Sequence, residues 1–312
     1  MTLLLLAACR GEQVSVSTDD NAQADSLALH VAVMPVADCL PICYAQEKRL
    51  FAKQGLDVRL QLFASQMDAD TALLYGHVEL AYTDLARLLE MQGDSLPLRA
   101  VAAMDGRLSL LTTRKKRIRR LQDLNERMIA LDRLSTSDYW SDEIMKQAGM
   151  ERTAIYRPQI NDVQLRRKML HDQLVDGALL PEPYATQAER QGHRRIFSTP
   201  DSAVIFNCLA TRANVLNVSR QRDQLQDFFR IYNQAVAELN HKPDEALLRT
   251  IWLRDYQLPA SLADSMPPLS YPKARSPKDA DADAALQWLL ARERTLNRRQ
   301  RDSLLSKLPL DH

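Results

Sequence analysis

The sequence predicts an α/β fold of two lobes, followed by a helical C-terminal region. Strand-like alternation and helix-like periodicity succeed each other from Leu27 to about Gly93, and a second series of the same kind runs from Met128 to Phe197. The apolar run Ala203 to Ala210 suits a strand that returns to the first series. Strands and helices in this order form a parallel sheet covered by helices.

The first series contains three strand–helix units. Asp38 is a natural N-cap for the first helix, Ser65 and Asp68 form a capping pair for the second, and Thr83 and Asp84 cap the third. The expected strands are 27–34, 56–62 and 78–82, and the helices begin near 38, 65 and 83. Two more strands, about 98–104 and 108–113, follow without a long helix between them.

The second series predicts four strands and three helices. The strands are expected at 128–131, 154–156, 177–180 and 195–197, and the helices at 138–148, 163–171 and 183–191. From Val218 onward the pattern is helical, with an apolar stripe over 225–239 and later helices at 243–254, 281–295 and 298–306. We therefore expect lobe one at 27–112 and 209–312, and lobe two at 113–208. Chain crossings near 110–114 and 204–210 would form a hinge.

The composition excludes several classes of protein. The chain has 312 residues, of which 46% are hydrophobic, enough for a sizeable core in about two domains. Lys and Arg number 41 and Asp and Glu number 40, so the formal net charge of +1 gives no support for nucleic-acid binding by bulk charge. No apolar run approaches the roughly 20 residues that span a bilayer.

The N-terminus indicates a membrane anchor. Leu6-Ala7-Ala8-Cys9 resembles the bacterial lipoprotein box, in which cleavage exposes the cysteine for acylation. This interpretation makes residues 1–9 a lipoprotein signal, Cys9 the lipidated residue and 10–26 a polar tether. A chance apolar start is the alternative.

No metal, cofactor or catalytic motif is expected. Cys39 and Cys43 are four residues apart, but neither has histidine or cysteine neighbours at zinc-ligand spacing, and the six histidines are scattered. Nucleotide-binding glycine motifs and a serine nucleophile elbow are absent. The basic run from Arg114 to Arg120 lacks interleaved aromatic residues, so it suits a solvated connection better than a nucleic-acid surface.

Candidate ligand-binding residues follow from the strand-to-helix corners. In open α/β sheets ligands bind beyond the carboxyl ends of the strands, where the helix starts point their amides. For many of these residues capping alone explains the residue type. Three hydroxyls in a row at 135–137 suggest a cradle for a sulfonate, carboxylate or phosphate oxygen. The candidates are Asp38, Cys39, Ser65, Gln66, Thr83, Asp84, Ser135, Thr136, Ser137, Glu182 and Tyr184.

Several strings resemble one known family. They are Val33 to Pro41 followed by Tyr44 to Phe51, Gly55-Leu56-Asp57-Val58, Gly76-His77-Val78-Glu79, Ser135-Thr136-Ser137-Asp138-Tyr139 and Glu182-Pro183-Tyr184-Ala185. In this order they resemble the periplasmic solute-binding proteins of ABC importers for sulfonates, taurine, nitrate and thiamine-pyrimidine precursors. The resemblance covers roughly residues 29–271. The chain departs from it at Arg49, where the family usually has glycine, and at Cys39, where histidine is common.

The resemblance implies a type II periplasmic-binding fold that closes over a small polar solute. The expected function is a monomeric, extracytoplasmic, lipid-anchored receptor that delivers its solute to an ABC permease and its ATPase. The carboxylates suggest a ligand with amine or hydroxyl groups. The serine and threonine amides suggest that the ligand also has an anionic end. An amino-sulfonate and an aminopyrimidine are both compatible with these two expectations. The alternatives are an enzyme on the same scaffold, such as a thiamine-pyrimidine synthase or a menaquinone-pathway dehydratase, and a ligand-free scaffold lipoprotein.

Overall fold

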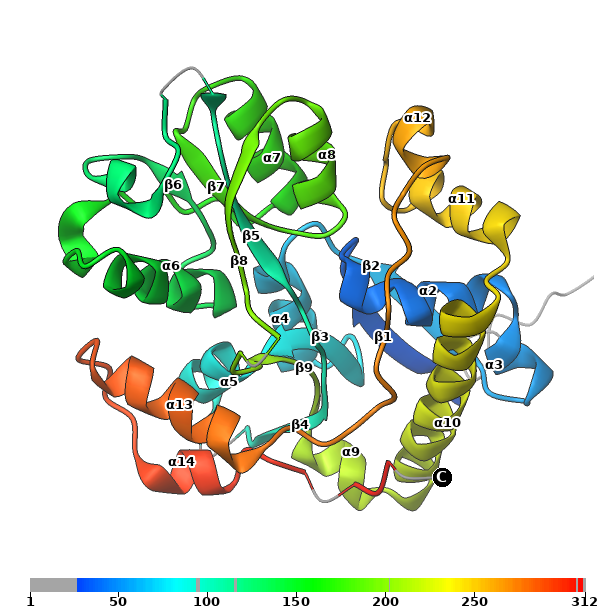
Figure 1. Ribbon diagram of the computed structural model, residues 1–312. Helices are drawn as coiled ribbons and strands as arrows, with labels where there is room; N and C mark the ends of the chain where they lie inside the picture. Colours follow the sequence, from blue (N-terminus) through cyan, green and yellow to red (C-terminus); the bar gives the residue numbers. More distant parts are fainter. Residues whose placement is uncertain (1–26, 94–95, 115–116, 202, 307, 311–312) are drawn as a thin grey trace, which may run out of the picture.

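The computed structural model describes residues 27–93, 96–114, 117–201, 203–306 and 308–310. The expected signal at 1–9, the lipidation of Cys9 and the tether at 10–26 lie outside the described residues. The chain folds around two β-sheets, and we call the parts around them lobe one and lobe two (Figure 1). Within the described part, no helix is both long and apolar enough to cross a membrane.

The sheet of lobe one has five strands in the order β2-β1-β3-β9-β4. The strands β1 (Leu29–Val33), β2 (Val58–Leu62) and β3 (Leu80–Asp84) are parallel, as their sequence predicted. The return strand β9 (Asn207–Arg212) lies antiparallel between β3 and β4 (Leu98–Ala103). The sheet of lobe one therefore combines strands from the beginning of the chain with the return strand β9.

Short helices follow the first three strands at one end of this sheet. They are η1 (Ala37–Cys39), α2 (Leu40–Glu47), α3 (Leu50–Lys53), α4 (Gln66–Tyr75) and α5 (Leu85–Met91). The expected caps are confirmed for α4, where Ser65 Oγ accepts a bond from the Asp68 amide over 3.2 Å and Gly76 ends the helix at φ 79°. For α5 the cap is Asp84 alone, while Thr83 is a buried residue of β3.

The sheet of lobe two has four strands in the order β6-β7-β5-β8. These are β5 (Leu108–Thr112), β6 (Ile129–Ala130), β7 (Gly177–Pro181) and β8 (Arg194–Ser198). Around them lie η3 (Leu121–Leu124), α6 (Thr136–Gln147), η4 (Arg152–Ala154), α7 (Val163–His171) and α8 (Tyr184–Arg190). In Figure 1 this lobe, drawn in green, stands above lobe one.

Three sequence predictions are wrong in detail. Residues 108–112, expected in lobe one, form β5 in the second sheet because both of its edges pair there, with β7 and β8. The crossings therefore lie at 104–107 and 199–206. The expected strand at 154–156 is η4 followed by isolated bridges, where Pro158 has no N–H to continue a ladder. The return strand begins at Asn207, because residues 203–206 pass between the sheets without a partner strand.

The C-terminal helices cover lobe one. They are α9 (Ala213–Asn217), α10 (Ser219–His241), α11 (Glu245–Arg254), α12 (Ala260–Ala263), α13 (Asp279–Leu290) and α14 (Arg298–Asp302). The apolar stripe of α10 packs on α2 and α3, where Phe228 stacks on Phe51 with ring centres 5.2 Å apart. On the other side of the lobe α13 packs on α5, next to α14 (Figure 1).

The C-terminal end of α13 also reaches lobe two. Trp288 Nε1 donates to Asp142 Oδ2 over 2.9 Å, and Arg292 Nη1 donates to Asp138 Oδ2 over 2.6 Å. The Arg292 guanidinium also lies 4.7 Å from the centre of the Trp288 ring. Asp138 and Asp142 belong to α6; the Asp138 side chain is fully buried and the Arg292 side chain is 7% exposed. We call Trp288 and Arg292 the α13 strap, because they join the lobes outside the chain crossings.

Candidate ligand-binding site

A cavity of about 150 Å³ lies between the two lobes. Its volume matches that of an engineered cavity known to admit benzene. Lobe one contributes the loop after β1, the crossing Asp105 to Arg107, and Tyr82 on β3. Lobe two contributes the start of α6, the end of β7 and Arg166 on α7. Residues Leu269 to Pro272, which follow α12, close one side.

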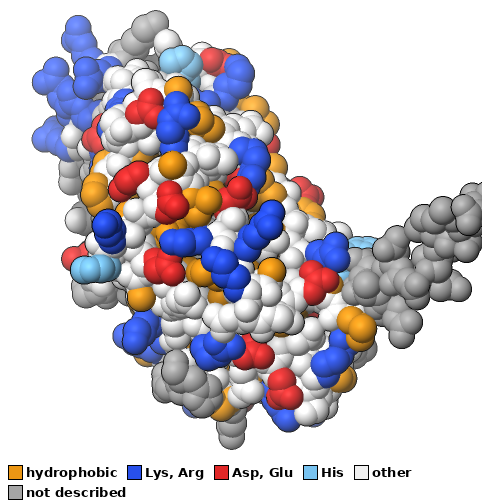
Figure 2. Space-filling model, turned by 90° about the vertical axis from the view of Figure 1, so that its right-hand side faces the viewer, with side chains coloured by type: hydrophobic (Ala, Val, Ile, Leu, Met, Phe, Trp, Pro, Cys, Tyr) orange, Lys and Arg blue, Asp and Glu red, His pale blue; other side chains and the backbone are white. Residues whose placement is uncertain are grey.

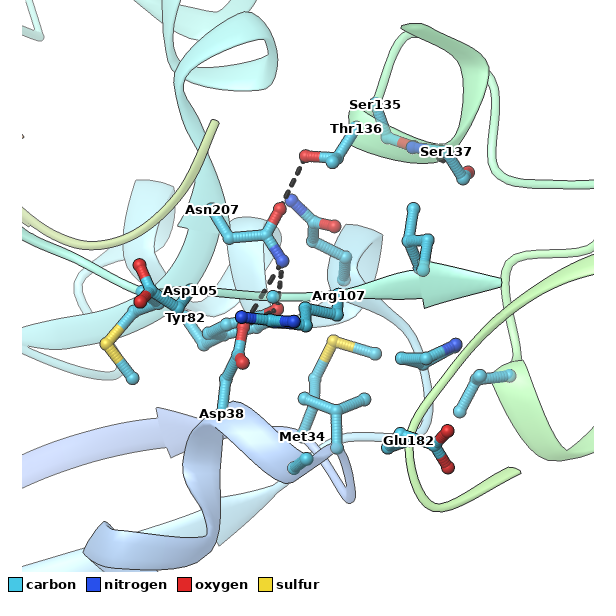
Figure 3. Close-up of a pocket in the computed structure, with 18 of the residues that line it drawn as sticks. Met34, Asp38, Tyr82, Asp105, Arg107, Ser135, Thr136, Ser137, Glu182 and Asn207 are labelled. Carbon is cyan, nitrogen blue, oxygen red and sulfur yellow. Dashed lines mark hydrogen bonds between the residues drawn. The ribbon is translucent and has the colours of Figure 1, made fainter. Parts of the chain in front are cut away.

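Three side chains of lobe one form a hydrogen-bonded group in the cavity (Figure 3). Asp38 lies in η1 after β1, Tyr82 lies on β3, and Asn207 is the first residue of β9. The Tyr82 hydroxyl donates to Asp38 Oδ2 over 2.9 Å, and Asn207 Nδ2 donates to the same oxygen over 3.3 Å. Burial outweighs these two neutral donors and raises the pKa of Asp38 to about 6.

The crossing from lobe one to lobe two passes directly over this group at Gly106. A side-chain carbon added to Gly106 would lie closer than 3.0 Å to Asn207 Nδ2 and to Asp38 Oδ2. No ordinary contact between non-bonded heavy atoms is so short, so this position requires glycine. The crossing therefore packs against the side chains that face the cavity.

The first turn of α6 faces the cavity from lobe two, but its donors are occupied. Ser135 Oγ and Ser137 Oγ donate to the Asp132 carbonyl over 2.7 and 3.0 Å, and the Thr136 hydroxyl donates to Oδ1 of the asparagine on β9. The Thr136 amide donates to Asp84 Oδ2 over 3.0 Å, and the Ser137 amide donates to Ser135 Oγ over 3.1 Å. The start of α6 is therefore not the open anion cradle that its sequence suggested.

Asp84 joins helix starts of both lobes beside the cavity. Its Oδ1 accepts from the Arg87 amide over 2.9 Å and so caps α5 of lobe one. Its Oδ2 accepts from the Thr136 amide of lobe two and from Gln66 Nε2, the latter over 3.1 Å. The hydrogen bond between Asp84 and α6 therefore links lobe one to lobe two in the arrangement that this structure shows.

Two buried charged side chains face the cavity from lobe two. Arg166 on α7 donates to the carbonyls of Ile160 and Leu179, each over 2.9 Å. Asp132 is only 4% exposed, and within the described residues its Oδ1 has no hydrogen-bond partner, although Arg87 Nη1 lies 3.8 Å away. Burial raises the pKa of Asp132. Asp132 is therefore a buried carboxylate of the cavity wall whose ion-pair partner, Arg87, lies beyond hydrogen-bonding distance.

The other two acidic groups of the lining already have cationic partners. Glu182 Oε1 accepts from Arg195 over 3.0 Å, and Glu182 Oε2 accepts from the Thr186 amide over 3.0 Å. Asp105 accepts from Arg275 at the mouth of the cavity. Glu182 nevertheless helps to close the cavity, because its main-chain carbonyl accepts from an amide of η1 in lobe one over 2.8 Å.

Comparison with known proteins places the chain in a family. A family model described as NMT1/THI5 like matches residues 36–246, about two thirds of the chain. The chain belongs to the NMT1/THI5-like family. The match includes both crossings and the α6 start but ends before α13 and the α13 strap. A search of curated proteins found no match to this NMT1/THI5-like sequence.

Solved structures share the fold at low sequence identity. A ligand-binding component of an ABC-type import system from Staphylococcus aureus, solved with zinc bound, is 15% identical, with a TM-score of 0.74 and coverage of 91% of this chain and 99% of that one. The aliphatic sulphonate binding protein SsuA from Escherichia coli is 17% identical, with a TM-score of 0.70 and coverage of 88% and 91%. The nitrate-binding protein NrtA from Synechocystis PCC 6803 is 14% identical, with a TM-score of 0.74 and coverage of 89% and 86%. The predicted periplasmic-binding fold is confirmed.

The structure brings about half of the predicted site residues of this NMT1/THI5-like chain to the cavity. Those that line it are Asp38, Gln66, Ser135, Thr136, Ser137 and Glu182. Those that lie outside the lining are Cys39, Ser65, Thr83, Asp84 and Tyr184, all of them buried. Ser65 and Asp84 act as helix caps, and Cys39 packs in the hydrophobic core. The Thr83 hydroxyl accepts from Gln66 Nε2 over 3.4 Å, and the Tyr184 hydroxyl donates to the Tyr256 carbonyl over 3.3 Å.

Sequence reasoning missed several residues of the lining. Tyr82 and Asn207 belong to segments that were interpreted only as strands, and Asp132 and Arg166 were not considered. Two signals were present. A polar Asn207 interrupts the apolar run 203–210, and Asp132 comes two residues after the short strand β6, at the kind of corner from which the other candidates were taken.

The three described cysteines are buried as free thiols. Burial raises the pKa of Cys43 to about 12 and raises the pKa values of Cys39 and Cys208 well above the ordinary thiol value. Among the described residues no three His, Cys, Asp or Glu side chains are grouped closely enough to hold a metal ion. The chemistry of the cavity walls is therefore that of carboxylates, hydroxyls, amides and guanidinium groups.

The raised pKa of Asp38 predicts a pH dependence of stability. The pKa lies near 3.8 in the unfolded chain and at about 6 in the folded chain, so the folded state binds the proton more tightly. This stabilisation is complete below pH 3.8 and is lost as the pH rises through about 6; its size is about 3 kcal/mol at most. Asp38→Asn cannot titrate, so urea unfolding of the variant should lose less stability than the parent between pH 4 and pH 7. Equal losses would show that Asp38 has an ordinary pKa.

Proposed function

We propose that this chain is the extracytoplasmic solute-binding component of an ABC importer, and that it binds its solute in the cavity between the lobes. One observation carries the proposal. The two carboxyl groups of the lining that have no hydrogen-bonded cation, Asp38 and Asp132, face the same cavity from opposite lobes. A ligand that donates to both would hold the lobes together, and such differential contact is what drives closure.

The lining favours a donor-rich ligand over an anion. The amides at the start of α6 are occupied, Arg166 is bound to carbonyls, and Arg107 is exposed and paired with Asp201. A nitrate or sulfonate would therefore meet the carboxylates of Asp38 and Asp132, and the neutral Tyr271 hydroxyl would compensate their repulsion only weakly. An amine or amino-substituted ring would instead supply donors to Asp38 and Asp132.

An aminopyrimidine satisfies these conditions best. Its exocyclic amino group donates hydrogen bonds, and its ring nitrogens accept them. Tyr271 faces the cavity, and its buried hydroxyl has no hydrogen-bond partner in the described part of the chain. Burial raises the pKa of Tyr271 well above its usual value, so the hydroxyl stays protonated and can donate to a ring nitrogen. The cavity volume also suits one six-membered ring with small substituents.

The remaining parts of the proposal concern the setting of the receptor. Structural neighbours from Escherichia coli and Synechocystis are described as periplasmic binding proteins, which supports a location outside the cytoplasm. Release of the solute to a permease with its ATPase, anchoring through a lipid on Cys9 and a monomeric state complete the proposed function. Binding rather than catalysis is proposed because these neighbours are binding proteins.

A thermal-denaturation screen tests the ligand class. The panel contains aminopyrimidines, taurine, an alkanesulfonate and nitrate, each added to the purified chain. We expect stabilisation by an aminopyrimidine, of about 2.7 kcal/mol when its concentration is 100 times the dissociation constant. If only nitrate or the alkanesulfonate stabilises the chain, the ligand is an anion and the proposed aminopyrimidine class is wrong. Stabilisation by no compound of a wide solute panel would contradict the solute-binding function.

A further inference from the structure

One end of the lobe-two sheet lies far from the cavity. The strands β6, β7 and β8 begin at this end and β5 ends at it, because β5 is antiparallel to both β7 and β8. Leu108 and Pro181, at the other end of β5 and β7, line the cavity. Four residue-to-residue steps of about 3.3 Å along β5 separate the two ends by about 13 Å. What binds at the far end would leave the ligand site free.

Basic side chains gather at this far end. Arg114 follows β5, and the chain then folds back over the strand, since Thr112 Oγ1 donates to the Ile118 carbonyl and Ile118 is buried. Arg117 and Arg119 lie in this connection and are exposed. Figure 2 shows Lys and Arg side chains clustered at the top of the molecule, the end to which β5 points in Figure 1.

Few carboxylates neutralise these cations. Asp123 accepts from Arg120 and from two main-chain amides, and Asp172 pairs with Lys168. Asp176, the residue before β7, is buried and accepts from the Met128 amide over 3.0 Å. Arg114, Arg117 and Arg119 have no ion-pair partner among the described residues, whereas the neighbouring Arg120 pairs with Asp123. A cluster of unpaired cations attracts an extended anionic surface, and each contributes separately to the attraction.

Apolar side chains lie exposed beside the cations. Met128 precedes β6 and is 43% exposed, and Tyr156, bridged to it, is 62% exposed. Leu174 precedes β7 and is 58% exposed. The main chains join these positions, since the Asp176 amide donates to the Met128 carbonyl over 2.9 Å. Exposed aromatic and aliphatic groups among arginines suit the headgroup region of a bilayer, which accepts both.

We propose that this end of lobe two docks on the surface of an anionic phospholipid membrane. The docking surface, which we call the distal face, consists of Arg114, Arg117, Arg119, Met128, Tyr156 and Leu174. The arginines bind lipid phosphates, and the three apolar side chains enter the headgroup layer. A nucleic acid would use the arginines but would leave Met128 and Leu174 in water. The inference requires neither the proposed ligand nor a lipid on Cys9.

Vesicle co-sedimentation tests the distal face on the full chain. Cys9→Ser is used throughout, so that acylation contributes nothing. We expect binding to vesicles of equal parts phosphatidylcholine and phosphatidylglycerol, little binding to phosphatidylcholine alone, and release as salt is added. Combined Arg114→Ala, Arg117→Ala and Arg119→Ala substitutions should weaken binding about 100-fold. Tyr156→Ser with Leu174→Ser should weaken it by a smaller factor and leave its salt dependence unchanged.

A matched variant distinguishes the effect of the distal-face arginines from the effect of lowering the positive charge of the protein elsewhere. Arg222→Ala, Arg298→Ala and Arg299→Ala remove three exposed cations from α10 and α14 of lobe one, and this variant should bind the anionic vesicles like the parent. Circular dichroism verifies that every variant is folded. The proposal is overturned if both vesicle types bind equally, if the matched variant loses as much binding as the distal-face variant, or if the chain binds RNA but not the anionic vesicles.

Discussion

Asp38→Asn is expected to weaken aminopyrimidine binding about 100-fold at pH 7.5 while the protein stays folded. The substitution keeps the shape of the side chain but removes the charge that would accept from the ligand. Hydrogen bonds to a charged group contribute about 1.5–3 kcal/mol, and the upper part of this range corresponds to about 100-fold in affinity. Isothermal titration calorimetry measures the loss.

The unliganded variant should at the same time be at least as stable as the parent. Asp38 is buried beside the neutral Tyr82 and Asn207, so its charge destabilises the unliganded fold at pH 7.5. Weaker ligand binding together with undiminished stability is a combination that a merely damaged fold does not produce.

Asp105→Asn serves as the matched control. Asp105 also lines the cavity, but it is partly exposed and already bound to Arg275, so it contributes less to a ligand. We expect a loss of less than about tenfold, as for other solvent-exposed charges. Equal losses of affinity in Asp38→Asn and Asp105→Asn would contradict the proposed direct contact between Asp38 and the ligand.

Arg292→Leu is expected to favour separation of the lobes. The substitution breaks the α13 strap and leaves Asp138 buried without its closest cation, while Arg157 remains 3.7 Å away. Removing one partner of a buried ion pair costs about 3–5 kcal/mol, and here hydration of Asp138 on opening would relieve that cost. Small-angle X-ray scattering should record a larger radius of gyration without ligand, and the apparent affinity should fall by the fraction of closed molecules lost.

Two further variants test whether the strap acts as a pair. Arg292→Leu combined with Asp138→Asn should recover part of the affinity, because no buried charge is then left without a partner. Arg249→Leu breaks the exposed pair of Arg249 with Asp264 in lobe one and should change neither the radius nor the affinity. If Arg292→Leu leaves the scattering curve unchanged, the strap does not control the lobe arrangement.

Much of the fold could be predicted because its signals are local. Alternating apolar residues identified β1 and β2, and Ser65 with Gly76 bounded α4 closely. The sequence pattern of a buried strand does not show to which of two sheets the strand belongs. Residues 108–112 look the same in either lobe, and only their pairing with β7 and β8 decides the matter.

The site was predictable only to the extent that it depends on helix starts. A capping residue and a ligand-binding residue have the same chemistry, so capping alone explained both Ser65 and Ser137, although only Ser137 lines the cavity. Contacts between distant parts of the chain carried no sequence signal. Asn207 meets Asp38 across 169 positions, and the closeness of Gly106 to both depends on the path of the crossing.

The buried thiols have a practical consequence for the use of this protein as a sensor. Cys39, Cys43 and Cys208 are enclosed, and their raised pKa values leave almost no reactive thiolate at neutral pH. In a Cys9→Ser background, a single cysteine placed on the rim of the cavity could therefore carry a fluorescent dye without competing labels. This doubly substituted chain would then serve as a scaffold for an optical reporter of its own solute, with its three buried cysteines left in place.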